Sequence, residues 1–298
     1  MKDMFNEFKG LDVRTELPQK DDPLFKVFEL EEEIIRTYSV NDGVSFIQRD
    51  GFDTYQEIIK YLDKKLEKSI LTPRVLETYV DSRENIGRTN ETLARGVFSG
   101  ALLELVCRKN NGAPISLFGR GKQFDYLFSR AILVQNVYLE NIQGHSIFTN
   151  AGREGIIESL TVNNIVGNQL LAFSAKYGGT IKNVFVNNIC GDCLFLGAGE
   201  EGRAEYILAN NIKGLHSFQG FARLGYANHV LLTDMRDPQI LTNQGRIDNL
   251  IRDKDMNPTK ERLLRDMQKI VETYSSKNGE ERKSADKKMK RLQEEIFQ

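Results

Sequence analysis

The chain has 298 residues, of which 40% are hydrophobic and 28% are charged, and its formal net charge is −1. This composition is typical of one or two folded domains and excludes a disordered or fibrous chain. The near-zero net charge also excludes a global electrostatic field that would attract nucleic acid or a membrane surface.

Targeting signals and cysteine usage together indicate a cytoplasmic protein. The first residues, Met1 to Glu7, are mixed and polar, unlike a signal peptide. No apolar run approaches the roughly 20 residues of a transmembrane helix. Three cysteines are an odd number and do not make a secreted disulfide framework. We therefore expect a cytoplasmic location and no membrane partner.

Residues 1–107 are expected to form a helical N-terminal region. Helix starts are predicted where a capping side chain precedes a proline or an apolar run at helical spacing. The capping residues are Asp22, Asp53 and Thr72. Each is followed by apolar residues on one face of the predicted helix, so three amphipathic helices are expected before residue 82.

A fourth helix is predicted over 90–107, where Gly96 and Gly100 lie one turn apart and allow close packing. The next segment, 108–130, is irregular, although Leu117 to Arg120 resembles part of the repeat described below. A stack of strands needs a cover over its first edge, because open strand edges promote aggregation. We expect the helix at 90–107 to be that cover.

Residues 131–240 repeat the pattern hydrophobic-x-hydrophobic-x-Asn-Ile-x-Gly. The steps between copies are 23, 24, 23 and 23 residues, with the polar residue at Asn141, Asn164, Asn188, Asn211 and Asp234. A fixed step of this size indicates stacked identical units. The apolar residues four and two positions before the Asn predict a strand with one buried face. Asn tolerates a left-handed turn, and its amide can bond the Asn of the neighbouring unit.

The second half of each unit also aligns. Counted from the Asn, an apolar residue recurs at +7, a small residue at +11 and Gly at +14. Position +7 holds Phe148, Leu171, Phe195 and Phe218. We therefore expect about three short strands and three turns in each unit, with neighbouring strands at the usual spacing of about 4.8 Å.

The Val-x-Val-Asn-Asn-Ile wording of the repeat resembles the right-handed parallel β-helices of the pectate-lyase type. The resemblance covers about 110 residues and implies the scaffold only. It predicts a mainly β solenoid of about five coils of about 23 residues over 108–250. The alternative is a leucine-rich repeat, which places two residues, not one, between its last inward Leu and the Asn.

A helical hairpin is predicted at the C-terminal end, over 251–298. Asn257-Pro258 predicts the start of its first helix, and Asn278-Gly279 predicts the turn. Apolar residues in the second helix have the heptad spacing of a packed seam and are Ala285, Met289, Leu292 and Ile296. The hairpin is expected either to fold back on the coils or to pair with a second copy of the chain.

One outward column of the predicted coils is apolar, three positions before each Asn. It consists of Tyr138, Thr161, Phe185, Leu208 and Leu231. Apolar rows of this length usually mark a contact surface. Tyr138, Phe185, Leu208 and Leu231 are therefore the candidate residues for binding a protein partner or a second subunit. The alternative is that the terminal helices of the chain itself cover the column.

A second column, twelve positions after each Asn, is mostly basic. It contains Arg153, Lys176, Glu200 and Arg223, with Arg120 and Arg246 as its expected ends. Stacked basic residues repel one another unless an acid or an anion lies among them. Glu154, Glu200 and Glu201 would serve as internal acids. Otherwise, the column would bind a polyanion such as an acidic glycan, while the lack of interleaved aromatic residues makes nucleic-acid bases a poor fit.

Cys190, Cys193 and His216 form a third candidate site. Cys193 and His216 occupy the same repeat position in neighbouring coils, so the three side chains could bind zinc, with Asp192 or water as a fourth ligand. A single Cys-x-x-Cys is a weak signal, and the alternative is that one cysteine lies in the core as a small hydrophobic residue. No cofactor is otherwise expected.

Two functions fit these patterns. The first is a non-catalytic cytoplasmic β-helix scaffold that docks a protein partner or forms a homo-oligomer. The second is a binder of, or an enzyme on, an acidic glycan or other polyanion along the basic column. No pair of carboxylates shares a column, as a glycosidase would require, and the Asn-rich positions are better explained by side-chain ladders.

Overall fold

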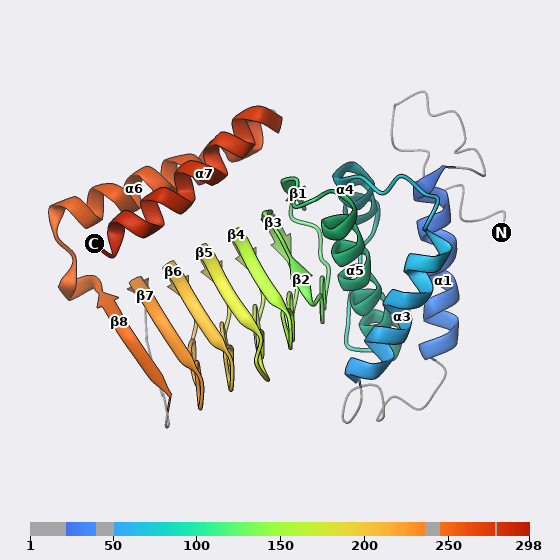
Figure 1. Cartoon of the computed structure of the whole chain (residues 1–298), viewed down its shortest axis with the longest axis horizontal. Coiled ribbons are helices and arrows are strands. Elements are labelled where there is room, and N and C mark those ends of the chain that lie inside the picture. The colour runs from blue at the N-terminus through green and yellow to red at the C-terminus, as the bar shows by residue number, and fades with distance from the viewer. Residues whose placement is uncertain (1–21, 40–50, 236–244, 278) are drawn as a thin grey trace.

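The computed structural model describes residues 22–39, 51–235, 245–277 and 279–298. Helices at the N-terminal end abut a stack of parallel strands, and two helices at the C-terminal end lie along one side of that stack (Figure 1). The architecture is a parallel β-solenoid with helices at both ends, as the repeat and the flanking helical patterns predict.

The N-terminal helices begin at or near the predicted caps. They are α1 (Pro23–Ser39), α3 (Gly51–Lys65), α4 (Pro73–Ser82) and α5 (Asn90–Lys109). Only α3 departs from the prediction, because it begins before Asp53. Thr89 caps α5 through reciprocal hydrogen bonds with Thr92, which satisfy backbone groups that have no partner within the helix.

Helix α5 covers the first coil of the solenoid, as predicted, and most of its residues are buried. Gly96 and Gly100 allow this close approach. A methyl group at Gly96 would clash with Tyr126, and one at Gly100 would clash with the carbonyl group of Ser129. The two glycines therefore place the helix backbone directly against the backbone of the coil.

The strands of the solenoid form one parallel sheet. They are β1 (Ile115–Phe118), β2 (Leu133–Val134), β3 (Val137–Gln143), β4 (Ile156–Val166), β5 (Thr180–Cys190), β6 (Arg203–Lys213), β7 (Tyr226–Met235) and β8 (Arg246–Arg252). Their order is β1-β3-β4-β5-β6-β7-β8, with β2 beside β4. The first coil begins with β1, so the segment 108–130 does contain an imperfect coil.

The register of the sheet follows the repeat. Phe185 is aligned with Thr161 in the strand before it and with Leu208 in the strand after it. Equivalent repeat positions therefore form columns along the solenoid axis. Inward apolar residues of all the coils join the buried residues of α1, α3, α4 and α5 in one continuous core.

Each repeat Asn adopts the predicted left-handed backbone, with φ of 57° at Asn141, 54° at Asn164 and 56° at Asn188. The bend does not end the strand, because β4, β5 and β6 continue for two residues beyond it. The expected second short strand is thus the continuation of the first. It begins a second leg of the coil, at an angle to the first leg.

The third expected strand, around position +7, is not formed. Left-handed residues such as Ser146, Phe148 and Asn150 alternate there with residues of negative φ. Phe148 donates its N–H to the preceding coil, at Leu127 (2.8 Å), whereas Ala151 donates to Phe148 in its own coil (3.1 Å). Some backbone N–H groups in this half of the coil therefore bond within their own coil and others bond to a neighbouring coil. As a result, this half consists of stacked turns, without the continuous hydrogen-bond ladder of a strand.

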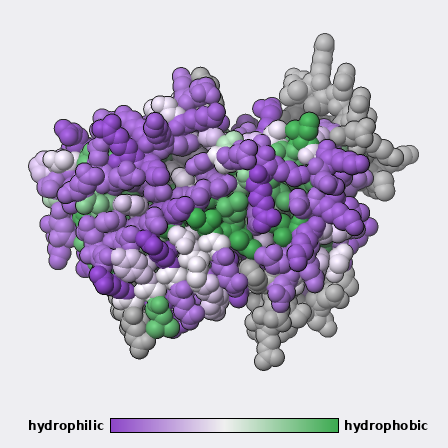
Figure 2. All heavy atoms as spheres, in the orientation of Figure 1, coloured by the Kyte–Doolittle hydropathy of each residue, from purple (hydrophilic) through white to green (hydrophobic). Residues whose placement is uncertain are grey.

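The C-terminal hairpin folds back along the sheet from β8 toward β1 (Figure 1). It consists of η2 (Asp253–Asp255), α6 (Pro258–Glu272), η3 (Tyr274–Ser276) and α7 (Gly279–Ile296). The side chain of Asn257 caps α6 by accepting the N–H of Lys260 (2.9 Å). Figure 2 shows hydrophilic residues over the outer side of the hairpin, while hydrophobic residues reach the surface where the N-terminal helices meet the first coils.

Candidate functional site

The predicted apolar column is buried by the chain itself. Tyr138, Phe185, Leu208 and Leu231 are each 1% exposed or less. Together with Ile251 they form one side of a hydrophobic cluster that is separate from the main core. The other side comes from the hairpin: Leu263, Leu264, Met267, Ile270, Val271, Tyr274, Ala285, Met289, Leu292 and Ile296. Of the two alternatives, this structure has self-coverage, and a partner would reach the column only if the hairpin moved away.

Aromatic contacts fix the hairpin at both ends of the column. Tyr138 stacks on Tyr274 with ring centroids 4.1 Å apart and donates its hydroxyl to the carbonyl of Val271 (3.1 Å). Toward the other end, Phe297 packs against His229, with ring centroids 4.9 Å apart. The heptad residues of α7 are all buried in this cluster, so in this structure the seam is used within one chain.

A buried polar ladder runs beside the apolar column, one position before each repeat Asn. Thr233 donates to Asn210 (2.8 Å), Asn210 to Asn187 (2.7 Å), and Asn187 to Asn163 (2.9 Å). Asn163 donates to Glu140 (2.7 Å). The ladder confirms the prediction that Asn-rich positions form side-chain ladders, and it gives Asn163, Asn187 and Asn210 a structural role. Of the repeat asparagines themselves, all of which lie in the described part of the chain, only Asn211 and Asn188 bond to each other as predicted.

The basic column is neutralised at its centre. Glu200, which is only 6% exposed, forms ion pairs with both Lys176 and Arg223. Arg153 lies over the ring of Tyr177, 4.7 Å from its centroid. Burial lowers the pKa of Lys176, which adds to the cost of placing a charge here. The predicted internal acid is therefore present between the basic residues.

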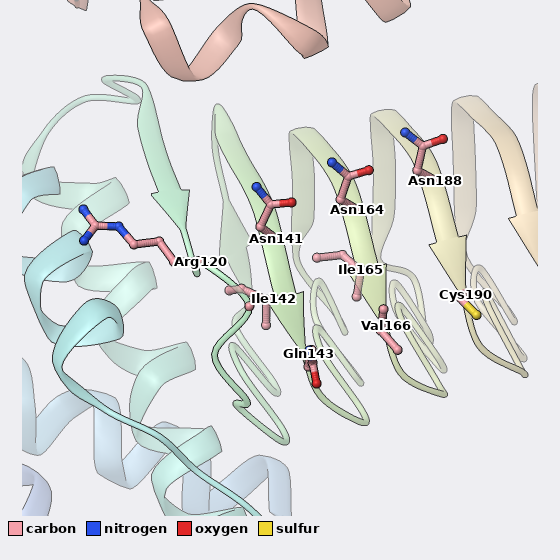
Figure 3. A pocket seen from close by; sticks show the side chains of 10 residues that line it. Arg120, Asn141, Ile142, Gln143, Asn164, Ile165, Val166, Asn188 and Cys190 are labelled. Carbon is pink, nitrogen blue, oxygen red and sulfur yellow. The ribbon is translucent and has the colours of Figure 1, made fainter.

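The two expected ends of the basic column lie elsewhere. Arg246 is in register with Tyr226, and Tyr226 is in register with Arg203, so Arg246 does not continue from Arg223. Arg120 follows β1, where the backbone is bonded to Asn141, and its side chain extends toward the N-terminal helices (Figure 3). The prediction that Arg120 and Arg246 end the column was wrong, because the first and last coils do not keep the 23-residue step of the repeat.

The three predicted zinc ligands do not assemble into a metal site. Cys193 and His216 lie in equivalent turns of neighbouring coils, as expected. Cys190, however, is exposed at the end of β5, and Cys193 is half-buried. Burial raises the pKa of the Cys193 thiol, which disfavours the thiolate that zinc binds. Over the part of the chain that the structure describes, no group of three or more His, Cys, Asp or Glu side chains could hold a metal ion.

A shallow groove, which we call the Asn groove, crosses the first coils at the strand bends (Figure 3). Its volume is about 430 Å³. Its lining residues are Arg120, Gly121, Asn141, Ile142, Gln143, Asn164, Ile165, Val166, Asn188 and Cys190. Figure 3 shows the three Asn amides side by side, with Gln143, Val166 and Cys190 along the opposite side of the groove.

The amides of the Asn groove differ in their bonding. Asn188 accepts a hydrogen bond from Asn211 (2.6 Å), so it belongs to a coil-to-coil ladder. The side chains of Asn141 and Asn164 are exposed and make no hydrogen bond to any residue that the structure describes. Val166, beside them, is 52% exposed. The repeat does not reveal this site, because Gln143, Val166 and Cys190 occupy its variable position, where dissimilar residues are expected.

Two buried carboxylates were also missed. Glu104 of α5 accepts hydrogen bonds from Tyr55 of α3 (2.5 Å) and from the N–H of Ile132 in the first coil (3.1 Å). Glu31 of α1 is 0% exposed and bonds to Tyr79 and two arginines. Both carboxylates are enclosed by partners, so they join helices and are not positioned to reach a substrate.

No protein-family model, no curated protein and no solved structure matches this chain. Among the helices that the structure describes, none is long and apolar enough to cross a membrane.

Proposed function

We propose that this protein is a non-catalytic interaction module that binds an extended segment of a protein partner in the Asn groove. The observation that carries the proposal is the pair of unbonded amides, Asn141 and Asn164, next to the exposed side chain of Val166. At the far end of the groove, Asn188 accepts a hydrogen bond from Asn211, whereas the amides of Asn141 and Asn164 have no such bond and remain open to a ligand.

The chemistry of the groove fits a peptide. An amide side chain both donates and accepts hydrogen bonds, as does each peptide unit of an extended chain. Val166 offers apolar contact beside the amides. The side chain of Arg120 at one end is 75% exposed, and its ion pair with Asp81 is long, at 4.0 Å, so the guanidinium group remains accessible to a second acid. We therefore expect the bound segment to carry an acidic residue at that end.

The other candidate surfaces support the proposal less well. Partner binding through Tyr138, Phe185, Leu208 and Leu231 would require the hairpin to leave. Binding of an acidic glycan along the basic column would have to compete with Glu200 for Lys176 and Arg223. The Asn groove needs neither rearrangement.

The proposal is tested by photo-crosslinking. Benzoylphenylalanine replaces Val166 in one protein and Leu224, which is 51% exposed in a turn of a distant coil, in a control protein. Both proteins are irradiated in extract from their own cells, and the captured proteins are identified by mass spectrometry. We expect at least one protein to be captured from position 166 and not from position 224.

The captured protein is then purified and titrated against groove variants. Val166→Lys and Asn164→Ala should each weaken binding about five- to thirtyfold, since each loses a contact worth about 1–2 kcal/mol. Leu224→Lys should leave the affinity unchanged. Equal capture at both positions, or equal affinity of all variants, would show that the groove is not the binding site.

A further inference from the structure

The C-terminal hairpin differs in charge from the rest of the chain. Residues 257–298 contain eleven Lys and Arg against eight Asp and Glu, a formal charge of +3, whereas the whole chain carries −1. The basic residues concentrate in the middle of each helix. In α7, six of the ten residues from Arg282 to Arg291 are basic and one, Asp286, is acidic.

The basic residues lie in two stripes that point away from the sheet. Arg262, Arg265 and Lys269 are spaced i, i+3, i+7 on α6, and Lys283, Lys287 and Lys290 are spaced i, i+4, i+7 on α7. Such spacing places each set on one face of its helix. All six are exposed, and the apolar faces of both helices are buried against the sheet. The stripes therefore lie on the same outward side of the hairpin, which Figure 2 shows as hydrophilic.

Most of these side chains have no acidic partner. Lys283 pairs with Glu280 at 3.2 Å. Arg262, Arg265, Lys269, Lys287 and Lys290 make no ion pair with any residue that the structure describes. This contrasts with Lys176 and Arg223 on the coils, which share the buried carboxylate of Glu200. The hairpin thus keeps a formal charge of +3, and five of these six basic side chains form no ion pair within the part of the chain that the structure describes.

We propose that the outer faces of α6 and α7 bind the phosphate backbone of nucleic acid. Exposed lysines and arginines at helical spacing meet a line of phosphates without reading bases. Among the residues that the structure describes, neither helix has an exposed large hydrophobic side chain. The bases of a nucleic acid would therefore find no side chain to stack on. Binding should therefore be independent of sequence.

Nucleic acid fits this surface better than a membrane does. An amphipathic helix at a bilayer inserts its apolar face among the lipids. Here the apolar faces hold the hairpin on the solenoid, in the cluster formed with Phe185 and Leu208. Only the charged faces of α6 and α7 are then accessible to a ligand. These faces attract a dense row of negative charges, such as the phosphates of a nucleic acid. A surface that neutralises six duplex phosphates has a log–log salt slope of about −5, so its affinity falls roughly a thousandfold between 50 and 200 mM salt.

The test measures binding of the full-length protein to fluorescein-labelled nucleic acid by anisotropy. The probes are a random-sequence DNA duplex, an RNA duplex of equal length and a single-stranded RNA, each at 50 and 200 mM KCl. We expect micromolar or tighter binding to at least one probe at 50 mM and a large loss at 200 mM. The three probes show whether DNA or RNA supplies the backbone.

Two charge-reversal variants decide where binding occurs. The first combines Lys283→Glu, Lys287→Glu and Lys290→Glu on the hairpin. The matched control combines Lys60→Glu, Lys64→Glu and Lys68→Glu, three exposed lysines of the N-terminal helical region. Both variants change the net charge equally. We expect at least a hundredfold loss of affinity in the hairpin variant and less than a threefold loss in the control.

Several outcomes would overturn the proposal. These are no binding to any probe at 50 mM KCl, equal losses in the two variants, or tighter binding to vesicles containing 30% phosphatidylserine than to nucleic acid. Because Val166→Lys lies on the coils, it should leave nucleic-acid affinity unchanged. That variant separates failure here from failure of the proposed peptide site.

Discussion

Glu31 shows how one buried side chain can join three segments of a helical region. Its carboxylate accepts the Tyr79 hydroxyl of α4 (2.6 Å) and the Nε of Arg95 on α5 (3.1 Å). Arg83, just after α4, lies 2.8 Å from its other oxygen. A buried charge with this many partners stabilises the fold only while all of them remain in place.

We therefore predict that Glu31→Gln lowers the free energy of unfolding by about 3–5 kcal/mol, the usual cost of breaking a buried ion pair. Urea denaturation measures the change. Glu32→Gln is the control, because Glu32 is partly exposed and reaches Arg83 only at 4.0 Å. It should cost less than about 1 kcal/mol. Equal effects of the two substitutions would contradict the structural role of Glu31.

Asp286 makes the hairpin sensitive to pH. Burial raises its pKa from the usual 3.8 to about 6, despite the Tyr274 hydroxyl at 2.8 Å and the nearby Arg282. The folded protein then binds a proton that the unfolded chain has lost between pH 3.8 and about 6. This contribution to stability is present below pH 3.8 and is lost as pH rises through about 6.

We predict that Asp286→Asn raises the melting temperature at pH 7.5 and has a smaller effect at pH 4. The amide oxygen still accepts the Tyr274 hydroxyl, and the cost of a buried charge is removed. Thermal unfolding at the two pH values measures the effect, with the exposed Glu294→Gln as the control. A lower melting temperature of the variant at pH 7.5 would show that the charge of Asp286 is needed.

At the scale of elements, the hairpin and the apolar column depend on each other. The hairpin contributes ten buried side chains to a cluster that the coils complete with Tyr138, Phe185, Leu208, Leu231 and Ile251. Without the hairpin these coil residues would form an exposed apolar row, which favours association. The column is thus a contact surface, and in this structure its partner is part of the same chain.

We predict that a chain ending at Met256 keeps its β-sheet signal in circular dichroism but self-associates and binds the dye ANS. Size-exclusion chromatography and ANS fluorescence measure the two effects. Replacing Phe185 and Leu208 with Ser in the shortened chain should reduce both. If the shortened chain is monomeric and does not bind ANS, the exposed apolar column does not drive association, and the prediction is wrong.

The repeat alone was enough to predict the strand columns, because a period of 23 residues and a buried alternation define a register. Asn164 and Asn188 adopt the predicted left-handed turn for the same local reason. The turns around Phe148 were not predictable, because apolar residues at +7 suit a strand or a stacked turn equally. Only the hydrogen bonds distinguish the two.

The sites were less predictable than the fold because they combine residues far apart in the sequence. Tyr138 bonds to Val271 across 133 positions, and Glu31 bonds to Tyr79 across 48. No local pattern specifies such pairs. The neutralising role of Glu200 was one of two stated alternatives, because its neighbours belong to the same column. Equivalent asparagines in the repeat differ in their hydrogen bonds, so only the structure shows which amides of the Asn groove are unbonded.

At the scale of the whole molecule, the protein has two separate hydrophobic clusters. One joins the N-terminal helices to the interior of the coils, and the other lies between the outer face of the sheet and the hairpin. The second cluster has solvent along its outer side. Its helices should therefore open at a lower free energy than the rest of the molecule.

We predict that backbone amides in α6 and α7 exchange with deuterium faster than those in α5, which lies inside the first cluster. Hydrogen-exchange mass spectrometry measures this difference at pH 7. Asp286→Asn should slow exchange in the hairpin and leave α5 unchanged. Similar rates in all three helices would show that the molecule opens as a single unit.

The hairpin also sets a length limit on the solenoid. The path from β1 to β8 has seven strands and six spacings, or about 29 Å at the usual strand separation. The 18 residues of α7 span about 27 Å. The length of the hairpin therefore matches the number of coils that it covers. Gene duplication of one 23-residue unit would lengthen the stack by a rung that the hairpin could not reach, so growth of the repeat would require a longer hairpin to evolve with it.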